Sequence, residues 1–547
     1  MLVMFVSAAA FPAPSQAFHL APPPLHNPVL IVPGITGTEI YKGSDLLWPN
    51  VLKMADPVGS DSFMDPLAFK PDLQPLDTSV LPGAVIGLIK PIPLPGLDHL
   101  FKFDYTDGLI NQLKTEGYQE NEDIFTFPYD WRFGVARNAQ LLQVAIANIL
   151  SRSNADKIDV IAHSYGGLVV KKYIMDTGSP RIDKAVFVGT PNLGAPWAVK
   201  TLLAGSNLDI PLLSPAEIQK ISHNMPAVYD LAPSRQYVNK QGSYLGINTR
   251  TKLFSSTTQN LDYNDTENYL TGKGLNSLGI AEANQLHSAE YDNYDPKSRG
   301  VDPYNIVGCT TGTMDQLVER KSVPALPLVN GYAVSFSAGD GTVPLASADN
   351  IPTDGKVFYV KDADHAKMLG QDGTRQEIVK IISGDQSIQP GPNISQDSTQ
   401  CKLTGQVISI FSPVNITATD QNGNTAEVLA DGSVQNSIPD SRLEVVGDHK
   451  FLYLPEDSSQ AYKVRLTGTD NGTFTLSIDT IAGDALTSTS TYSDIPVTVD
   501  SSGQLDLKGK TLLDFGGKKY HPKVKKEHQG RKGTEEDDDQ DNGEAAE

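Results

Sequence analysis

One serine in this chain stands where a predicted strand, a tight turn and a predicted helix meet. Residues 157–161 read KIDVI, residues 162–167 read AHSYGG, and residues 168–174 read LVVKKYI. The turn has to be sharp, and Ala162 and Gly166, two positions on either side of Ser164, are small enough to let the backbones come close. Such a turn holds a serine hydroxyl clear of the backbone, and it requires a fold in which strands lead directly into helices.

The same alternation of strands and helices extends over residues 28–385. Short β-branched runs alternate there with amphipathic helical stretches, which predicts a mostly parallel sheet flanked by helices, the α/β class. Residues 138–151 carry their apolar side chains at helical spacing, so we expect a helix that leads into the strand before Ser164. Further strands are expected at residues 29–32, 124–127, 184–189, 304–309, 332–336 and 356–360.

Two long segments of this region do not fit a regular sheet. Residues 50–100 are rich in Pro and Leu, and residues 200–300 combine helical patches with polar loops. Long excursions inside a compact domain are more often functional covers than plain connections. We therefore predict that parts of both segments are lid or acyl-binding insertions. The alternative is that they are surface insertions without a function.

The composition changes after Asp385. Residues 386–400 are polar and contain Pro, which predicts a linker. Residues 401–515 show short alternating strands separated by Gly, Asn and Asp turns, which predicts a β-sandwich domain of the immunoglobulin-like type. Residues 518–547 are first basic and then acidic with almost no apolar residues, so we expect a disordered charged tail.

The apolar first residues, the net charge and the cysteine content limit where the protein acts and what it can bind. Residues 1–17 are apolar and small and end in SQA, which predicts a signal peptide and therefore a secreted, extracellular or cell-surface protein. No apolar run is long enough for a membrane-spanning helix. The formal net charge of −21 argues against nucleic acid as a partner. The only two cysteines, Cys309 and Cys401, exclude a disulfide framework and leave a single bridge open.

Ser164 needs a base and an acid, and chain order limits the choice. In an α/β-hydrolase the nucleophile comes first, the acid second and the histidine last. His365 is the histidine after Ser164 that stands between a predicted strand and a predicted helix. Asp340 follows the preceding strand in a loop flanked by glycines, and its role would be to orient the imidazole. Asp362 and Asp364 are the alternative acids, but they share the loop of His365, which makes the geometry harder.

Two backbone amides are candidates for an oxyanion hole. Tyr165 follows the nucleophile directly, and Ile35 lies in the loop after the first strand, with its neighbour Thr36 as the second choice. His163 adjoins Ser164 but is expected to be a packed neighbour rather than the base. No Cys/His cluster has the spacing of a metal site and no nucleotide-binding glycine motif follows a strand, so the sequence predicts neither a metal nor a cofactor.

Taken together, the motifs resemble the lecithin:cholesterol acyltransferase-like α/β-hydrolases. The resemblance covers roughly residues 28–385. The serine turn together with the GDGTVP segment is quite specific, whereas Pro-Gly or Gly-Thr-Pro alone is common among lipases. The matching segments are VLIVPG at 29–34, LWP at 47–49, YDWR at 129–132, AHSYGG at 162–167, GTPNLGAP at 189–196, GDGTVP at 339–344, and Asp364-His365.

The resemblance implies an acyl-serine mechanism on a glycerolipid ester, with the acyl group passed to an alcohol or to water. It assigns Ser164, Asp340 and His365 as the triad, and the amides of Ile35 and Tyr165 as oxyanion donors. It further implies that Trp48 lines the entrance and that Met225 and Tyr229 belong to an insertion near the acyl site. The chain departs from the family in having Ala162 where many members have glycine, and in lacking the paired lid cysteines of the vertebrate plasma enzyme.

These observations predict a secreted serine-dependent lipid esterase or acyltransferase that works on a lipid ester at a membrane or lipid surface. A peptidase or thioesterase on the same fold is one alternative. The other is a non-catalytic surface-binding protein in which the β-sandwich acts, binding a surface glycan or lipid. Head-group preference, acyl length and the acceptor alcohol do not follow from the sequence.

Overall fold

Buried, β-branched runs form the centre of the molecule, which we describe from a computed structural model. The structure describes residues 26–54, 56, 60–89, 103–208, 210, 213–252, 255–322, 331–411, 413–429, 432–456, 461–507 and 512–526. The predicted signal peptide at residues 1–17 lies outside these residues. Among the helices of the described part, none is long and apolar enough to cross a membrane.

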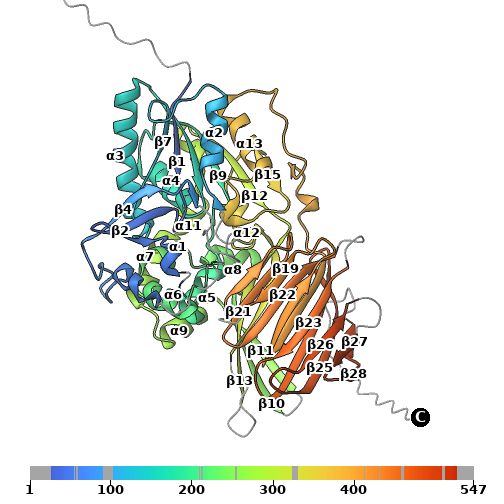
Figure 1. Cartoon of the computed structure of the whole chain (residues 1–547). Helices are drawn as coiled ribbons and strands as arrows, with labels where there is room; N and C mark the ends of the chain where they lie inside the picture. Colours follow the sequence, from blue (N-terminus) through green and yellow to red (C-terminus); the bar gives the residue numbers. More distant parts are fainter. Residues whose placement is uncertain are drawn as a thin grey trace, which may run out of the picture.

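A central sheet of seven strands carries the first part of the chain (Figure 1). The strand order is β16-β15-β12-β9-β8-β1-β7, and all neighbours are parallel except β15 and β16. All residues of β1 and β8 are buried, as expected for parallel strands covered on both faces. The strands are β1 (Val29–Val32), β7 (Ile124–Thr126), β8 (Ile158–His163), β9 (Ile182–Val188), β12 (Asp302–Gly308), β15 (Val357–Val360) and β16 (Ile394–Ser395).

Amphipathic helices pack along this sheet. Helix α3 (Val135–Ser153) lies against α4 (Tyr165–Asp176), and α13 (Asp372–Ser383) lies against α2 (Asp107–Thr115). The buried residues of α3, among them Leu142, Ile146 and Ile149, recur at helical spacing on one face. The predicted α/β class is therefore confirmed for this part of the chain.

One predicted strand belongs to a different sheet from the one expected. Residues 332–336 do form a strand, β14 (Tyr332–Gly339), but it pairs antiparallel with β13 (Thr311–Ser322). The resulting four-stranded sheet has the order β11-β10-β13-β14 and also contains β10 (Leu245–Lys252) and β11 (Ser255–Asn260). The reason is local: β13 and β14 are consecutive along the chain, and consecutive strands commonly pair with each other.

The two segments predicted as insertions fold against each other. Residues 38–85 contain a three-stranded sheet, α1 and the 3-10 helix η1, and residues 196–292 contain a group of helices and the strands β10 and β11. The amide of Ser214 donates to Asp61 Oδ2 at 2.8 Å, and Asn276 Nδ2 donates to the carbonyl of Pro71 at 2.9 Å. The elements are β2 (Thr38–Lys42), β3 (Asp45–Trp48), α1 (Val51–Met54), η1 (Asp61–Leu67), β4 (Val80–Val85), α5 (Pro196–Ala204), α6 (Pro215–Ser222), α7 (Pro226–Asp230), α8 (Arg235–Gln241), α9 (Tyr263–Gly272), α10 (Ser277–Leu286) and α11 (Ala289–Asp292).

The C-terminal part consists of two antiparallel sheets that enclose one apolar core. Ile408, Leu452 and Leu476 of one sheet share this core with Ile416 and Leu466 of the other. The first sheet has the order β21-β22-β17-β24-β25-β29 and the second the order β20-β19-β18-β23-β26-β27-β28. Their strands are β17 (Gly405–Phe411), β18 (Val414–Thr419), β19 (Thr425–Val428), β20 (Val434–Asn436), β21 (Arg442–Val446), β22 (His449–Pro455), β23 (Lys463–Gly468), β24 (Gly472–Ala482), β25 (Ala485–Val497), β26 (Ser502–Asp506), β27 (Leu512–Phe515), β28 (Lys518–Tyr520) and β29 (Lys523–Lys526).

Two segments expected to lack regular structure contribute strands. Residues 386–400, expected to be a linker, provide β16, which pairs with β15 through Ile394 and Ser395. Residues 518–526, expected to be the start of a disordered tail, form β28 and β29, and β29 pairs with β25. Backbone pairing to an edge strand needs no apolar side chains, which explains why a polar composition hid these strands. The rest of the predicted tail lies outside the described residues.

A disulfide joins the two parts of the chain. Cys309, which follows β12, is bonded to Cys401, which precedes the first strand of the C-terminal sheets. Of the residues that the structure describes, no cysteine is left free. We call residues 401–526 the C-terminal module from here on.

Candidate active site

Ser164 lies on a strained turn between β8 and α4. Its backbone has φ 53° and ψ −126°, a conformation that a residue with a side chain rarely adopts. Gly166 is required by close packing, because a Cβ atom at this position would lie 2.4 Å from the carbonyl oxygen of Pro33. The methyl group of Ala162 is buried without such a clash, so the departure from glycine at this position is tolerated.

The structure brings Ser164, His365 and Asp340 into one hydrogen-bonded row. His365 Nε2 lies 2.8 Å from Ser164 Oγ, and His365 Nδ1 lies 2.7 Å from Asp340 Oδ2. A carboxylate can only accept, so Nδ1 carries the proton and Nε2 is free to accept from the serine hydroxyl. The Ser164 residue is 5 % exposed and the Asp340 side chain is 0 % exposed, which keeps this row out of bulk water.

Asp340 is held by the loop that follows β14. Its Oδ1 accepts hydrogen bonds from the amides of Thr342 at 3.0 Å and Val343 at 2.7 Å, which leaves Oδ2 for the imidazole. The amide of His365 donates to the carbonyl of Asp340 at 3.0 Å, so the backbones of the two residues are also joined. The alternative acid Asp364 instead pairs with Lys367.

The two predicted oxyanion amides belong to two segments that meet at Ser164. Tyr165 is the first residue of α4, where helix amides have no partner within the helix. Ile35 lies in a turn closed by the amide of Gly37, which donates to the carbonyl of Gly34 at 3.1 Å. This turn approaches the serine closely, because a Cβ atom on Gly34 would lie 2.8 Å from Ser164 Cβ.

A buried chain of hydrogen bonds connects the turn that contains Ile35, the turn at Ser164 and the loop that carries His365. The amide of Gly34 donates to Tyr105 Oη at 2.8 Å, and Tyr105 Oη lies 2.9 Å from His163 Nδ1. His163 Nε2 lies 2.9 Å from the carbonyl oxygen of His365. That carbonyl can only accept, so Nε2–H donates to it and the hydroxyl of Tyr105 donates to Nδ1. Burial, followed by the nearby His365, lowers the pKa of His163 to about 3, which keeps it neutral as this chain requires.

His163 is thus a packed neighbour of the reactive serine, and Tyr105 is a residue that the sequence analysis missed. Tyr105 lies just before α2, 58 positions from His163, and no local pattern marks it. Its position between Gly34 and His163 makes it a positioning residue for the oxyanion turn and, through His163, for the backbone of His365.

Replacing Tyr105 by phenylalanine tests this positioning role. The variant leaves the amide of Gly34 and His163 Nδ1 without a partner, so we expect kcat for ester hydrolysis to fall about tenfold with little change in KM. Tyr41→Phe is the matched control, since Tyr41 Oη bonds only to the side chain of Glu39 on β2. An equal loss in both variants, or a loss confined to KM, would contradict the role of Tyr105.

A cavity of about 640 Å³ opens onto Ser164 and His365. Trp48 lines it, as the resemblance implied, and its Nε1 donates to the carbonyl of Thr36 at 2.7 Å. Met225 and Tyr229 do not line the cavity, whereas Leu231 of the same segment does. Both side chains are buried, and Tyr229 Oη bonds the main chain at His223 and Asn276, because α7 packs into the core instead of facing the cavity.

The chemistry available at this site is that of an activated serine. Within the described residues, no group of three or more His, Cys, Asp or Glu side chains could hold a metal ion. Acyl transfer through a serine requires a serine on a tight turn, an ordered histidine and two amide donors. The candidates for these parts are Ser164, His365 and the amides of Ile35 and Tyr165.

The chain is similar in sequence to several known acyltransferases. The family model described as lecithin:cholesterol acyltransferase matches residues 101–326, a span that contains Ser164 and ends before Asp340. The chain is 23 % identical over 304 residues to lecithin-cholesterol acyltransferase-like 1 of Arabidopsis thaliana, covering 51 % of this chain and 65 % of the relative. It is 25 % identical over 252 residues to the human phosphatidylcholine-sterol acyltransferase, covering 38 % and 53 %.

The lysosomal phospholipase A and acyltransferase of Rattus norvegicus is 24 % identical over 258 residues, or 40 % of this chain and 57 % of the relative. The chain thus spans between about half and two thirds of the length of these relatives. Among solved structures, the Tle4–Tli4 complex matches with a TM-score of 0.45 and 14 % identity, covering 66 % of this chain and 98 % of the other. The resemblance to the lecithin:cholesterol acyltransferase family is confirmed, at modest identity.

Proposed function

Because the chain is a relative of the lecithin:cholesterol acyltransferase family, we propose that it is a serine-dependent lipid esterase or acyltransferase. The observation that carries this proposal is the hydrogen-bonded row Ser164–His365–Asp340 at the mouth of the cavity. Ser164 is the nucleophile, His365 the base and Asp340 the residue that orients and stabilises the imidazolium.

The reaction proceeds through two acyl transfers. His365 Nε2 takes the proton of Ser164 Oγ while the oxygen attacks the ester carbonyl, and the amides of Ile35 and Tyr165 bind the resulting oxyanion. The tetrahedral intermediate collapses to an acyl-serine, and His365 gives its proton to the departing alcohol. Water or a second alcohol then attacks the acyl-serine by the same steps in reverse order.

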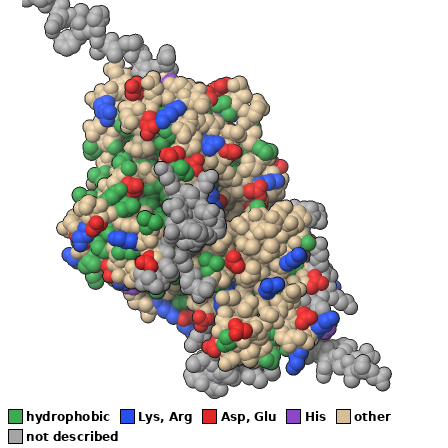
Figure 2. All heavy atoms as spheres, in the orientation of Figure 1, with side chains coloured by type: hydrophobic (Ala, Val, Ile, Leu, Met, Phe, Trp, Pro, Cys, Tyr) green, Lys and Arg blue, Asp and Glu red, His purple; other side chains and the backbone are tan. Residues whose placement is uncertain are grey.

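Two features support a lipid as the source of the acyl group. Apolar side chains, among them Val51, Met54 and Leu208, line the cavity beside Ser164. Leu52, Leu76 and Leu81, from the first predicted insertion, are more than half exposed. Figure 2 shows hydrophobic side chains gathered on the side of the molecule that carries β2, β4 and α1. Exposed leucines gathered on one side of the molecule are suited to contact with a lipid surface.

The same proposal includes the organisation of the whole chain. Residues 28–385 form the α/β-hydrolase domain with lid insertions at about 50–100 and 200–300, and residues 401–526, which extend past the predicted end at residue 515, form an immunoglobulin-like β-sandwich. A signal peptide at residues 1–17 and secretion are consistent with the disulfide between Cys309 and Cys401, since such bonds persist in oxidising environments.

Product analysis tests the function. The protein is incubated with vesicles of a phosphatidylcholine, with and without a long-chain alcohol or a sterol. Release of free fatty acid identifies an esterase, and a new ester of the added alcohol identifies an acyltransferase. Parallel incubations with an amide and a thioester of the same acid test the peptidase and thioesterase alternatives. Turnover of those substrates without any oxygen-ester hydrolysis would contradict the proposal.

A further inference from the structure

The cavity above Ser164 is walled by two parts of the chain that lie far apart in the sequence. One side comes from the α/β part, from residues between 35 and 54, between 195 and 210, and from the loops at 340–343 and 362–367. The other side comes from residues 434–443 of the C-terminal module, which comprise β20, the loop after it and the start of β21. We call residues 434–443 the module wall. The reactive serine thus faces a space that neither part encloses alone.

The two sides of the cavity differ in chemistry. The α/β side presents accessible apolar side chains, including Val51, Phe103, Trp197, Leu208 and Ile210, together with the polar residues of the loops that carry Asp340 and His365. On the module wall the apolar side chains of Val434, Ile438 and Leu443 are buried at 2–7 % exposure. Its accessible positions are mostly polar, namely Gln435, Asn436, Ser437, Asp440 and Arg442. The accessible apolar side chains of the cavity therefore come mainly from the α/β side, whereas the accessible side chains of the module wall are mostly polar.

Asp440 fixes the module wall to the loop that carries the histidine. Its Oδ1 lies 3.1 Å from Thr310 Oγ1 and 3.0 Å from Thr311 Oγ1, and its carbonyl accepts from the amide of Gly312 at 3.3 Å. Thr311 Oγ1 also lies 2.8 Å from the carbonyl oxygen of Ala363, two residues before His365. These hydrogen bonds join the module wall to the loop that carries His365.

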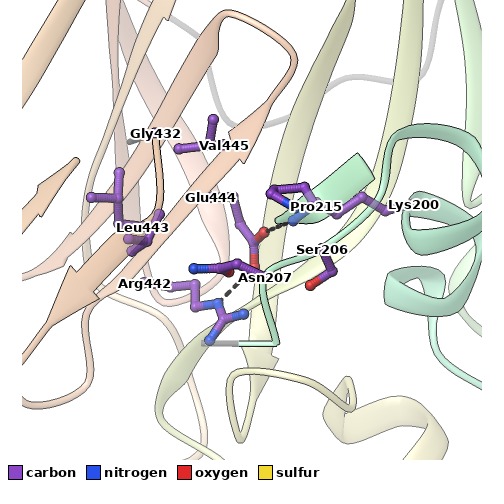
Figure 3. A pocket seen from close by; sticks show the side chains of 10 residues that line it. Lys200, Ser206, Asn207, Pro215, Gly432, Arg442, Leu443, Glu444 and Val445 are labelled. Carbon is purple, nitrogen blue, oxygen red and sulfur yellow. Dashed lines mark hydrogen bonds and ion pairs between the residues drawn. The ribbon is translucent and has the colours of Figure 1, made fainter. Parts of the chain in front are cut away.

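A second attachment lies next to the cavity (Figure 3). Glu444 lies between Lys200 of α5 and Arg442, and bonds to both. The side chains of Lys200 and Glu444 are 5 % and 2 % exposed. Although burial raises the pKa of Glu444, the charges of Arg442 and Lys200 outweigh it and lower the pKa to about 2, so the carboxylate stays charged. Separating such a buried ion pair leaves an unpaired charge out of water, which is strongly destabilising. The pair therefore stabilises the contact between α5 and the C-terminal module.

Direct packing also holds the module. Gly312 at the start of β13 faces the ring of Tyr453 so closely that a Cβ atom would lie 2.4 Å from Tyr453 Cδ1. Figure 1 shows β13 running beside the module, and β14 contacts β22. The module wall is therefore a rigid part of the cavity rather than a domain on a flexible tether.

We propose that the module wall binds the alcohol portion of the lipid ester, namely the glycerol and polar head group of the leaving alcohol. In acyl transfer the acceptor alcohol takes the same place. An ester whose carbonyl lies at Ser164 extends its acyl chain and its alcohol in opposite directions, and the accessible apolar side chains that suit the acyl chain lie mainly on the α/β side. Polar groups need hydrogen-bonding partners when they leave water, and the module wall supplies them. This inference rests on the proposed function.

Substrate panels with matched variants test the inference. Gln435→Leu and Asp440→Asn alter the module wall, Leu208→Ala alters the apolar side, and Gln504→Leu is the control. Gln504 lies in the same sheet as Gln435, on β26, is exposed and does not line the cavity. The readout is kcat/KM for octanoyl esters of p-nitrophenol, glycerol and glycerophosphocholine, and for p-nitrophenyl esters of increasing chain length.

We expect the module-wall variants to lower the preference for the glycerol-based esters over the p-nitrophenyl ester by about three- to tenfold, the effect of one lost hydrogen bond. Their chain-length profile stays that of the wild type. Leu208→Ala shifts the chain-length profile and leaves the head-group preference unchanged, and Gln504→Leu changes neither.

An unchanged head-group preference in both module-wall variants, or a chain-length shift in them, overturns the inference while ester hydrolysis itself continues. Absence of ester hydrolysis in the wild type overturns the proposed function instead. The two failures are therefore distinguishable in one set of assays.

Discussion

Replacing Ser164 by alanine is expected to lower kcat/KM for a lipid ester by about 10⁵-fold, because the acyl group loses its point of attachment. The remaining row of His365 and Asp340 then has no oxygen to activate. Hydrolysis of p-nitrophenyl octanoate measures the rate. Labelling by a fluorophosphonate probe, located by peptide mass spectrometry, reports whether Ser164 is the residue that reacts.

Ser151→Ala is the matched control for this experiment. Ser151 lies on an exposed position of α3, where alanine is compatible with the helix. Its rate and its labelling should equal those of the wild type. Near wild-type turnover or labelling in Ser164→Ala, with an unchanged melting temperature, would remove Ser164 from the mechanism.

Replacing Asp340 by asparagine is expected to lower kcat by about 10⁴-fold while the fold is retained. The carboxylate accepts three hydrogen bonds, two from the amides of Thr342 and Val343 and one from His365 Nδ1. An asparagine that keeps the two amide bonds presents its NH₂ group to the imidazole. His365 then adopts the other tautomer, which places a proton on Nε2 and prevents it from accepting the proton of Ser164.

Asp364→Asn provides the comparison for Asp340→Asn, because it makes the same chemical change one residue before His365. The carboxylate of Asp364 is half exposed and pairs with Lys367, so we expect at most a twofold change, about the worth of a surface ion pair. Stopped-flow measurement of acyl-serine formation separates the chemical step from product release. A larger loss in Asp364→Asn than in Asp340→Asn would reverse the assignment of the acid.

The reactive residues could be selected from the sequence because each carries a local signal. Ser164 lies between an apolar strand and a helix with small neighbours, and that pattern depends only on adjacent residues. Asp340 and His365 follow strands; chain order removes the histidines before Ser164, and a position between a predicted strand and a predicted helix selects His365 among those after it. The strands themselves could be predicted wherever they are buried on both faces, as in β1 and β8, since the apolar run is then continuous.

What could not be predicted depends on contacts between distant segments. The position of Tyr105 next to His163, and that of residues 434–443 beside Ser164, arise only when the chain is folded. Local apolar patterns do not distinguish a residue that lines a cavity from one packed in the core, so the sequence could not show that Leu231 lines the cavity while Met225 and Tyr229 are buried beside it. Sheet membership is equally non-local, because β14 has the composition of a central strand but pairs with its neighbour β13.

The disulfide between Cys309 and Cys401 divides the reactive residues topologically. The two cysteines are 92 positions apart, and Asp340 and His365 both lie inside the covalent loop that they close, whereas Ser164 lies outside it. Closing a loop of this length destabilises the unfolded chain by about 4 to 5 kcal/mol in the chain-entropy model. When the structure opens locally, acid and base therefore remain linked to the first residues of the module and can reassemble as one unit. Oxidation of the two cysteines is therefore expected to stabilise the part of the chain that carries Asp340 and His365.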